Sequence, residues 1–154
     1  MQESGSFSLN KTVSSLVLSA RVGNFEVVRF LTSLLNDTNP ANNDGFTPLH
    51  EAAKNGHLDL VEFLASLSND KNPASNNGFT PLHLAAQYGH LEVVKYLTSF
   101  LNDTNPANND GETPLEYAAY SGHIDAVNYL ASLLNLSNQD YNNWLEIAKN
   151  SNKT

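Results

Sequence analysis

The sequence predicts an all-α solenoid, in which helix–turn–helix units are stacked along one axis. A period of 33 residues separates Thr47, Thr80 and Thr113, and the same period relates the prolines and glycines around them. Each threonine stands before a proline, and apolar residues then recur at helical spacing until a glycine follows. One such unit cannot bury its own apolar face, whereas stacked neighbours form a continuous core.

The first helix of each unit begins at a Thr-Pro pair. Thr47 can accept a hydrogen bond from the unpaired N–H groups of the first turn, and Pro48 suits the first helical position. Leu49, Ala52 and Ala53 then form a narrow apolar stripe of mostly small residues. Small side chains allow neighbouring helices to approach closely, and the glycine that follows ends the helix.

The second helix is longer, as in "HLDLVEFLASL", where Leu58, Val61, Leu64 and Leu67 fall on one face. Its first turn always holds an acidic residue, which the helix dipole favours. We expect each second helix to end at an asparagine in the left-handed conformation, namely Asn36, Asn69, Asn102 and Asn135. An extended loop with a turn glycine leads to the next unit.

The repeat can be followed along most of the chain. It divides the sequence into a tail (1–8), a cap-like first repeat (9–42), three repeats (43–75, 76–108 and 109–139) and a C-terminal half-repeat or cap (140–154). The last segment is either a one-helix cap or the point at which a longer protein was cut. As a cap, it has Trp144 at the usual proline position, and Trp144 and Ile147 cover the last repeat.

Composition excludes several classes of function. The 154 residues carry a net charge of −8, which disfavours nucleic acid and anionic membranes because both attract Lys and Arg. There is no cysteine, so disulfides, thiolate zinc sites and cysteine nucleophiles are excluded. No apolar run approaches the ~20 residues of a membrane span, and the first residues lack a signal pattern. We expect an intracellular, cytoplasmic monomer.

The segment "GFTPLHLAAQYGHLEVVKYL" (Gly78–Leu97) resembles the ankyrin repeat, and the resemblance extends from about Leu9 to Asn150. It implies L-shaped units with β-hairpin fingertips, first helices that line a concave groove, and second helices on the convex back. The family's usual function is protein binding. Three features depart from its pattern: the first repeat lacks Thr-Pro-Leu-His, Glu116 replaces a histidine, and other residues replace the glycine after the second helix (Leu35, Ser68, Leu101 and Leu134).

The histidines are predicted to be structural. In the family, residues such as His50 and His83 tie the first helix to its threonine and the adjacent loop. Glu116 fits the same role, because Thr113 and Glu116 have the spacing of a capping box. Histidines on neighbouring stacked helices are roughly 8–10 Å apart, too far to share one zinc ion. Phosphate-loop, G-x-S-x-G and H-E-x-x-H motifs are absent, so we expect no catalytic residues, metal ligands or cofactor.

The candidate binding residues are those that vary between repeats at positions the resemblance exposes. Fingertips and first-helix ends supply Arg21, Phe46, Lys54, Phe79, Gln87, Tyr88, Glu112, Tyr117 and Tyr120. Aromatic residues at such positions favour a protein contact. Charge also grades from Arg21 and Lys54 to Glu112 and Glu116, which favours a protein or peptide partner whose basic segment lies toward the C-terminal repeats.

Three alternatives remain open from the sequence. The phenylalanines either contact a partner or pack on a neighbouring fingertip. The chain as a whole is either a binding module or a passive spacer of a longer protein, with part of an enzyme as a third reading. Loop asparagines either serve their own turns or, as the resemblance implies, undergo β-hydroxylation at Asn39, Asn72, Asn105 and Asn138.

Overall fold

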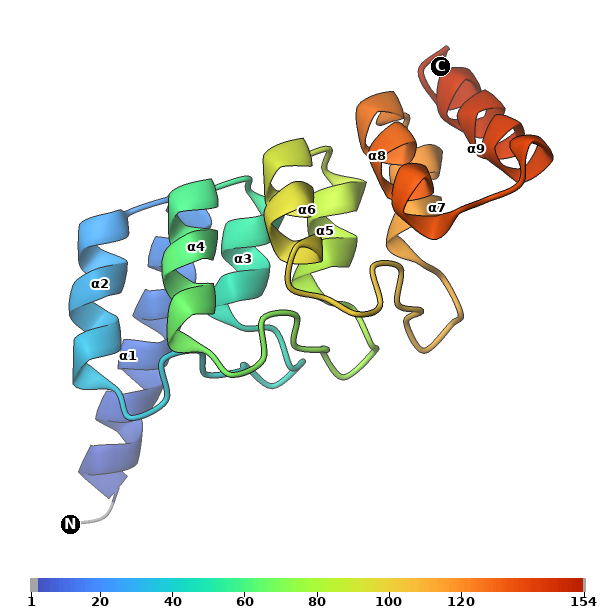
Figure 1. Ribbon diagram of the computed structural model, residues 1–154. Coiled ribbons are helices and arrows are strands. Elements are labelled where there is room, and N and C mark those ends of the chain that lie inside the picture. The colour runs from blue at the N-terminus through green and yellow to red at the C-terminus, as the bar shows by residue number, and fades with distance from the viewer. Residues whose placement is uncertain (1–2, 154) are drawn as a thin grey trace.

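The computed structural model describes residues 3–153, and its helices form two rows (Figure 1). One row holds the first helices of the units: α1 (Glu3–Val22), α3 (Pro48–Lys54), α5 (Pro81–Gln87), α7 (Pro114–Tyr120) and α9 (Asn138–Ser151). The other holds the second helices: α2 (Phe25–Leu34), α4 (Leu58–Leu67), α6 (Leu91–Thr98) and α8 (Ile124–Leu134). The predicted all-α solenoid is confirmed, and the long loops all project on the same side (Figure 1).

Small side chains allow the first helices to pack closely along the row. Ala52, Ala53, Ala85 and Ala86 are completely buried, as are Leu49 and Leu82. Helix α1 contacts α3, α3 contacts α5, and the series continues to α9. The core is therefore continuous from one end of the described chain to the other.

The second helices differ from their prediction at one position of the apolar face. Val61 and Leu64 are fully buried, but Leu67 has 43% of its surface exposed. Leu60 is buried in its place. Leu67 is the last residue of α4, where the chain leaves the helix, so its side chain is only partly covered by the neighbouring units.

The predicted asparagine ends are right only at Asn135, which has a left-handed conformation with φ 52°. Helices α2 and α4 stop earlier, and the next residues, Leu35 and Ser68, are extended. Each donates its backbone N–H to a carbonyl three residues back, at Thr32 or Ala65. The chain can therefore turn directly into the loop without a left-handed residue.

The fingertips are hydrogen-bonded turns, and no strand occurs among residues 3–153. The Asn42 N–H donates to the Phe46 carbonyl (2.8 Å), and the Asn42 side chain accepts from the Phe46 N–H (2.9 Å). Neighbouring fingertips are joined through their backbones, because Asn76 N–H donates to the Asp44 carbonyl (3.0 Å). Gly45 has φ 82°, and a Cβ there would lie against the backbone of Asn76.

Both ends of the solenoid have longer helices than the sequence predicts. Helix α1 begins at Glu3, within the expected tail, whose residues 1 and 2 lie outside the described chain. Helix α9 begins after the cap Ser137, so the expectation that Trp144 stands at a helix start is wrong. Trp144 and Ile147 nevertheless pack partly buried against the core.

Candidate functional site

The buried histidines link each first helix to the next fingertip. His50 accepts a hydrogen bond at Nδ1 from the Thr47 N–H (3.1 Å), so Nε2 carries the proton and donates to the Phe79 carbonyl (3.0 Å). His83 makes the equivalent bonds with Thr80 N–H (3.2 Å) and the Glu112 carbonyl (3.2 Å). Both side chains are fully buried, and burial lowers the pKa of each. The predicted structural role is confirmed.

Glu116 takes the place of the histidine in the capping box of the fourth repeat, as the sequence predicts. Its carboxylate accepts from the Thr113 N–H at 2.7 Å, while Thr113 Oγ1 accepts from the Glu116 N–H. A carboxylate has no proton to donate onward as a histidine does. Glu116 therefore completes the capping box without reaching a following fingertip.

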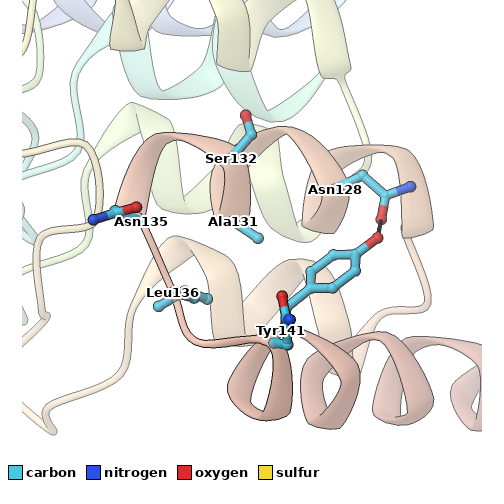
Figure 2. Close-up of a pocket in the computed structure, with 7 residues that line it drawn as sticks. Asn128, Ala131, Ser132, Asn135, Leu136 and Tyr141 are labelled. Atoms are coloured by element: carbon cyan, nitrogen blue, oxygen red, sulfur yellow. Dashed lines mark hydrogen bonds between the residues drawn. The ribbon is translucent and has the colours of Figure 1, made fainter.

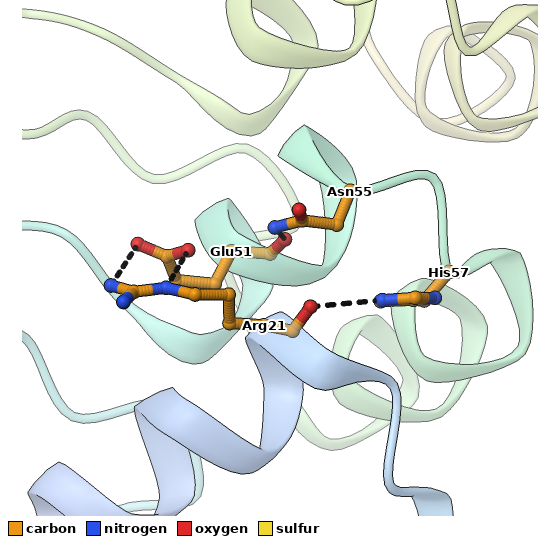
Figure 3. Close-up of polar contacts among 4 residues, drawn as sticks. All are labelled: Arg21, Glu51, Asn55 and His57. Carbon is orange, nitrogen blue, oxygen red and sulfur yellow. Dashed lines mark hydrogen bonds and ion pairs between the residues drawn. The ribbon is translucent and has the colours of Figure 1, made fainter.

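A second set of histidines joins adjacent units at the opposite end of the helices. His57 Nε2 bonds to the Arg21 carbonyl (3.0 Å; Figure 3), and His90 bonds to the Lys54 carbonyl (2.9 Å). His123 reaches the Gln87 carbonyl in the same way (2.9 Å). Each histidine thus donates a hydrogen bond to a carbonyl at the end of the preceding first helix, where the helix itself supplies no donor. Among residues 3–153, no group of three or more His, Asp or Glu side chains could hold a metal ion.

Arg21 is engaged by a neighbouring repeat. Its Nε lies 3.0 Å from Glu51 Oε2 and its Nη2 lies 3.4 Å from Oε1, which makes a two-pronged ion pair (Figure 3). The Glu51 side chain is only 13% exposed, and its hydrogen bond and charge raise the pKa of Arg21. The basic end of the predicted charge gradient is therefore largely neutralised at Arg21.

Two tyrosines are the most exposed aromatic side chains on the first-helix ends. Tyr88 is 46% exposed and Tyr120 is 58% exposed. Each has one face or edge held by a neighbouring unit: Lys54 Nζ lies 5.4 Å from the centre of the Tyr88 ring, and Trp144 lies 6.2 Å from Tyr120 in an edge-on contact. Gln87, the residue before Tyr88, is partly buried.

At the fingertips, Phe79, Glu112 and Tyr117 form one cluster. The rings of Phe79 and Tyr117 are 5.4 Å apart, and the Tyr117 hydroxyl donates to the Glu112 carboxylate. Asn108 Nδ2 donates to the same carboxylate at 3.1 Å. These bonds lower the pKa of Glu112, while burial, followed by the bond to Glu112, raises the pKa of Tyr117 to about 12. Glu112 therefore stays ionised and Tyr117 neutral across the physiological range.

Both phenylalanines pack against other rings of the solenoid, which agrees in part with the packing alternative. Phe46 lies edge-on to His50, with ring centres 5.1 Å apart, and Phe79 packs on both His83 and Tyr117. Both phenylalanines remain partly exposed. Phe46 contacts its own repeat, whereas Phe79 also contacts the next, so only Phe79 belongs to the cluster with Glu112.

The repeats are recognised independently by comparison with known proteins. A family model described as "Ankyrin repeats (3 copies)" matches residues 5–74 and again residues 66–143. The chain belongs to the ankyrin-repeat family. Ankyrin repeats generally serve protein–protein interaction and are typically non-catalytic. No curated protein matches the chain.

Two hollows of this ankyrin solenoid lie away from the predicted site. One, of about 390 Å³, opens between α8 and α9 and is lined by Asn128, Ser132 and Tyr141 among others (Figure 2). The Tyr141 hydroxyl and Asn128 Oδ1 bond across it at 2.9 Å (Figure 2). No predicted binding residue lines this hollow. No helix among residues 3–153 is long and apolar enough to cross a membrane.

Sequence reasoning missed the residues that hold the predicted ones in place. Glu51 pairs with Arg21, and Asn108 positions Glu112. Trp144, which the sequence had assigned to cover the last repeat, also supports Tyr120. The only available signal was register: in the stacked ankyrin units, a residue near the end of one first helix faces the middle of the next. Because none of these pairs recurs identically in the other repeats, the period alone did not reveal them.

Proposed function

We propose that this ankyrin chain is a non-catalytic module that binds an extended protein or peptide along its concave face. The binding surface consists of the first-helix ends and the fingertips, with Tyr88 and Tyr120 as its central anchors. The observation that supports it is the exposure of these two rings, at 46% and 58%, on consecutive units of the row. We expect the module to act in the cytoplasm, which the absence of cysteine favours.

The support given to each ring makes it suitable as an anchor. Tyrosine offers large contact area at a small cost in conformational entropy, and binding hot spots are enriched in it. Lys54 stacked on Tyr88 and Trp144 beside Tyr120 restrict the rings before a partner arrives. Such restriction reduces the entropy lost on binding.

The charges favour a partner with a basic segment at the C-terminal repeats. Glu112 is ionised at its fingertip, and Asp110 is exposed beside it. At the other end of the surface, Arg21 is neutralised by Glu51, so Lys54 supplies the remaining positive charge. The partner's basic residues would therefore lie over Glu112, and its apolar residues over Tyr88 and Tyr120.

The test is to capture a partner from cells that express the chain, identify it by mass spectrometry, and titrate it by calorimetry. Tyr88→Ala should weaken binding by ~2 kcal/mol or more without lowering the melting temperature, since the ring is half exposed. Glu112→Lys should mainly slow association.

The matched controls are Lys95→Ala and Glu62→Ala, which change exposed residues on second helices. Both should leave the affinity unchanged. If these variants lose affinity and Tyr88→Ala does not, the partner binds the convex side and the proposed surface is wrong. If a captured protein is affected by no variant on either face, it binds elsewhere on the chain and the proposed surface is wrong.

A further inference from the structure

One large apolar residue is exposed at the same position of every second helix. The four residues stand at or just after the helix ends and follow the 33-residue period: Leu34, Leu67, Phe100 and Leu133. Their exposed fractions are 60%, 43%, 51% and 41%. We call this set the apolar ladder. Because α2, α4, α6 and α8 stand side by side in one row (Figure 1), the ladder runs along the length of the solenoid.

The rest of the exposed surface of the second helices is polar. In α4, α6 and α8, every other exposed residue is polar or charged, as Asp59, Glu62 and Ser66 are in α4. In α2, which has no unit of the described chain before it, Val27 and Phe30 are exposed as well. Apolar residues scattered singly over a surface need no explanation, whereas a contiguous apolar surface marks an interaction site. The ladder is of the second kind, because it recurs in four stacked units.

Aromatic rings support the ladder from below. Phe63, Tyr96 and Tyr129 each stand four residues before a ladder residue, on the same helix face, and pack partly buried against the core. The ring of Tyr96 meets that of Phe100 edge-on, with centres 5.0 Å apart. The Tyr129 hydroxyl bonds to Thr98 of the preceding unit at 3.1 Å. A surface held in place in this way loses little conformational entropy when it binds.

Carboxylates flank the ladder on the side of the loops. Three residues after a ladder residue stands an exposed aspartate in three of the units: Asp37, Asp70 and Asp103. Each side chain accepts the backbone N–H of the residue two positions later, at 2.9–3.0 Å, so the carboxylates have fixed positions. Among residues 8–153, no ion pair involves these three carboxylates.

The whole surface around the ladder is acidic. The segments that carry the second helices and the loop starts contain eight acidic and two basic residues (24–37, 57–70, 90–103 and 123–136). Both basic residues, Arg29 and Lys95, are already paired with a glutamate of their own helix. Lys71 adds one cation, whose Nζ lies 5.4 Å from the centre of the Phe100 ring. The surplus of carboxylates disfavours nucleic acid and anionic membranes and favours a basic partner.

The spacing of the ladder decides the form of that partner. Packed helices lie about 8–10 Å apart, which sets the distance between successive ladder residues. Seven residues of an α-helix rise about 10.5 Å, so an apolar residue at every seventh position meets one ladder residue after another. In an extended strand, residues on one face recur at about 6.6 Å and again at about 13 Å, and neither distance matches. The ladder therefore fits a helix better than a strand.

We propose that the apolar ladder binds a basic amphipathic helix of a partner protein, which lies along the solenoid across α2, α4, α6 and α8. The apolar residues of that helix contact the four ladder residues, and its Lys or Arg residues lie over Asp37 and Asp103. Such a helix places its apolar face against an apolar surface, as in other helix-recognition sites. The site goes beyond the function proposed above, since no ladder residue belongs to a first helix or a fingertip. The chain can therefore hold two partners at once.

The test uses a synthetic helical peptide as the probe. The peptide has about four heptads, with leucine at every seventh position, lysine beside each leucine and alanine elsewhere. A control peptide has the same composition, but its leucines stand at every fifth position and so spread around the helix. Measured by fluorescence anisotropy, the full chain should bind the first peptide about tenfold more tightly than the second.

Variants of the chain locate the peptide. Leu67→Gln and Phe100→Gln should each weaken binding about tenfold, because they remove an apolar contact without a change of charge. Leu18→Gln is the matched control, since Leu18 is an exposed leucine (55%) of α1 outside the ladder, and it should bind like the wild type. Asp103→Asn should weaken binding at low salt and flatten its salt dependence, while the asparagine oxygen can still accept the Asn105 N–H. Thermal melts confirm that each variant is folded.

Three outcomes would overturn the proposal. The first is equal binding of the two peptides, and the second is a loss in Leu18→Gln as large as that in Leu67→Gln. The third is another occupant, which sedimentation of the chain alone and with phosphatidylcholine vesicles detects. Self-association or vesicle binding that Leu67→Gln abolishes would assign the ladder to a second copy or to a lipid surface. None of these results affects the concave surface, whose test depends on Tyr88 and on a captured partner.

Discussion

Replacing His83 by alanine should destabilise the chain by about 2–4 kcal/mol. The change removes an acceptor for the Thr80 N–H and a donor to the Glu112 carbonyl, each net worth about 0.5–1.5 kcal/mol. The Glu112 carbonyl keeps the bond from Asn108 N–H (2.8 Å), but the Thr80 N–H loses its partner in a residue only 5% exposed. The imidazole is fully buried, so the cavity it leaves adds to the loss.

The same side chain should make stability depend on pH. Burial holds the pKa of His83 in the folded state below its ordinary value of 6.5. Below pH 6.5, the unfolded chain then binds more protons than the folded chain, so protonation favours unfolding. The contribution of His83 is fully present above about pH 7 and is lost as the pH falls below 6.5. His50, buried in the same way, adds a parallel contribution.

Urea denaturation at several pH values between 8 and 5 measures both effects. His83→Ala should lower the midpoint at pH 8 and should show a shallower loss of stability on acidification than the wild type. His90→Ala is the control, since His90 is partly buried and makes one bond to the preceding helix. It should cost less and leave the acid slope of His83 in place. A variant as stable as the wild type, or one whose loss appears only when zinc is added, would refute the structural role of His83.

Three further predictions follow from individual contacts. Leu97→Ala should lower the free energy of unfolding by ~2–5 kcal/mol in a denaturant melt, because Leu97 is fully buried. Leu67→Ala, at a 43% exposed position, should lower it much less. Equal losses in the two variants would contradict the assigned burial. Tyr117→Phe should raise the pKa of Glu112 toward its ordinary value, because the hydroxyl that donates to the carboxylate is lost. NMR titration of the carboxylate measures this change. An unchanged pKa would mean that the bond from Asn108 alone stabilises the ionised carboxylate. Intact-mass measurement on protein from its native cells should show no added oxygen on the loop asparagines. The side chains of Asn39, Asn72 and Asn105 each accept a hydrogen bond from a backbone N–H of the next helix (3.0–3.1 Å). A hydroxylated species at these residues would overturn this expectation.

Local signals in the sequence were sufficient for most of the fold. A Thr-Pro pair caps a helix through atoms within four residues, so the starts of α3, α5 and α7 could be predicted without knowing their neighbours. The capping role of Glu116 followed for the same reason, whereas that of His50 was implied by the resemblance to the ankyrin repeat. The repeat period then implied stacking, because no single unit could bury its own apolar stripe. The exposure of Tyr88 and Tyr120 agrees with the candidate positions, while their role in binding stays a prediction.

The tertiary structure decided what depends on one unit facing another. Arg21 and Glu51 are thirty residues apart, and only the register between α1 and α3 brings them to 3.0 Å. Likewise, Phe79 and Tyr117 belong to successive repeats, and their rings come within 5.4 Å only because the fingertip of one unit meets the first helix of the next. Val27, which is 37% exposed where Leu60 and Val93 are buried, is the clearest case. Val27 has the apolar character of its equivalents, and it is exposed only because no unit of the described chain lies before it.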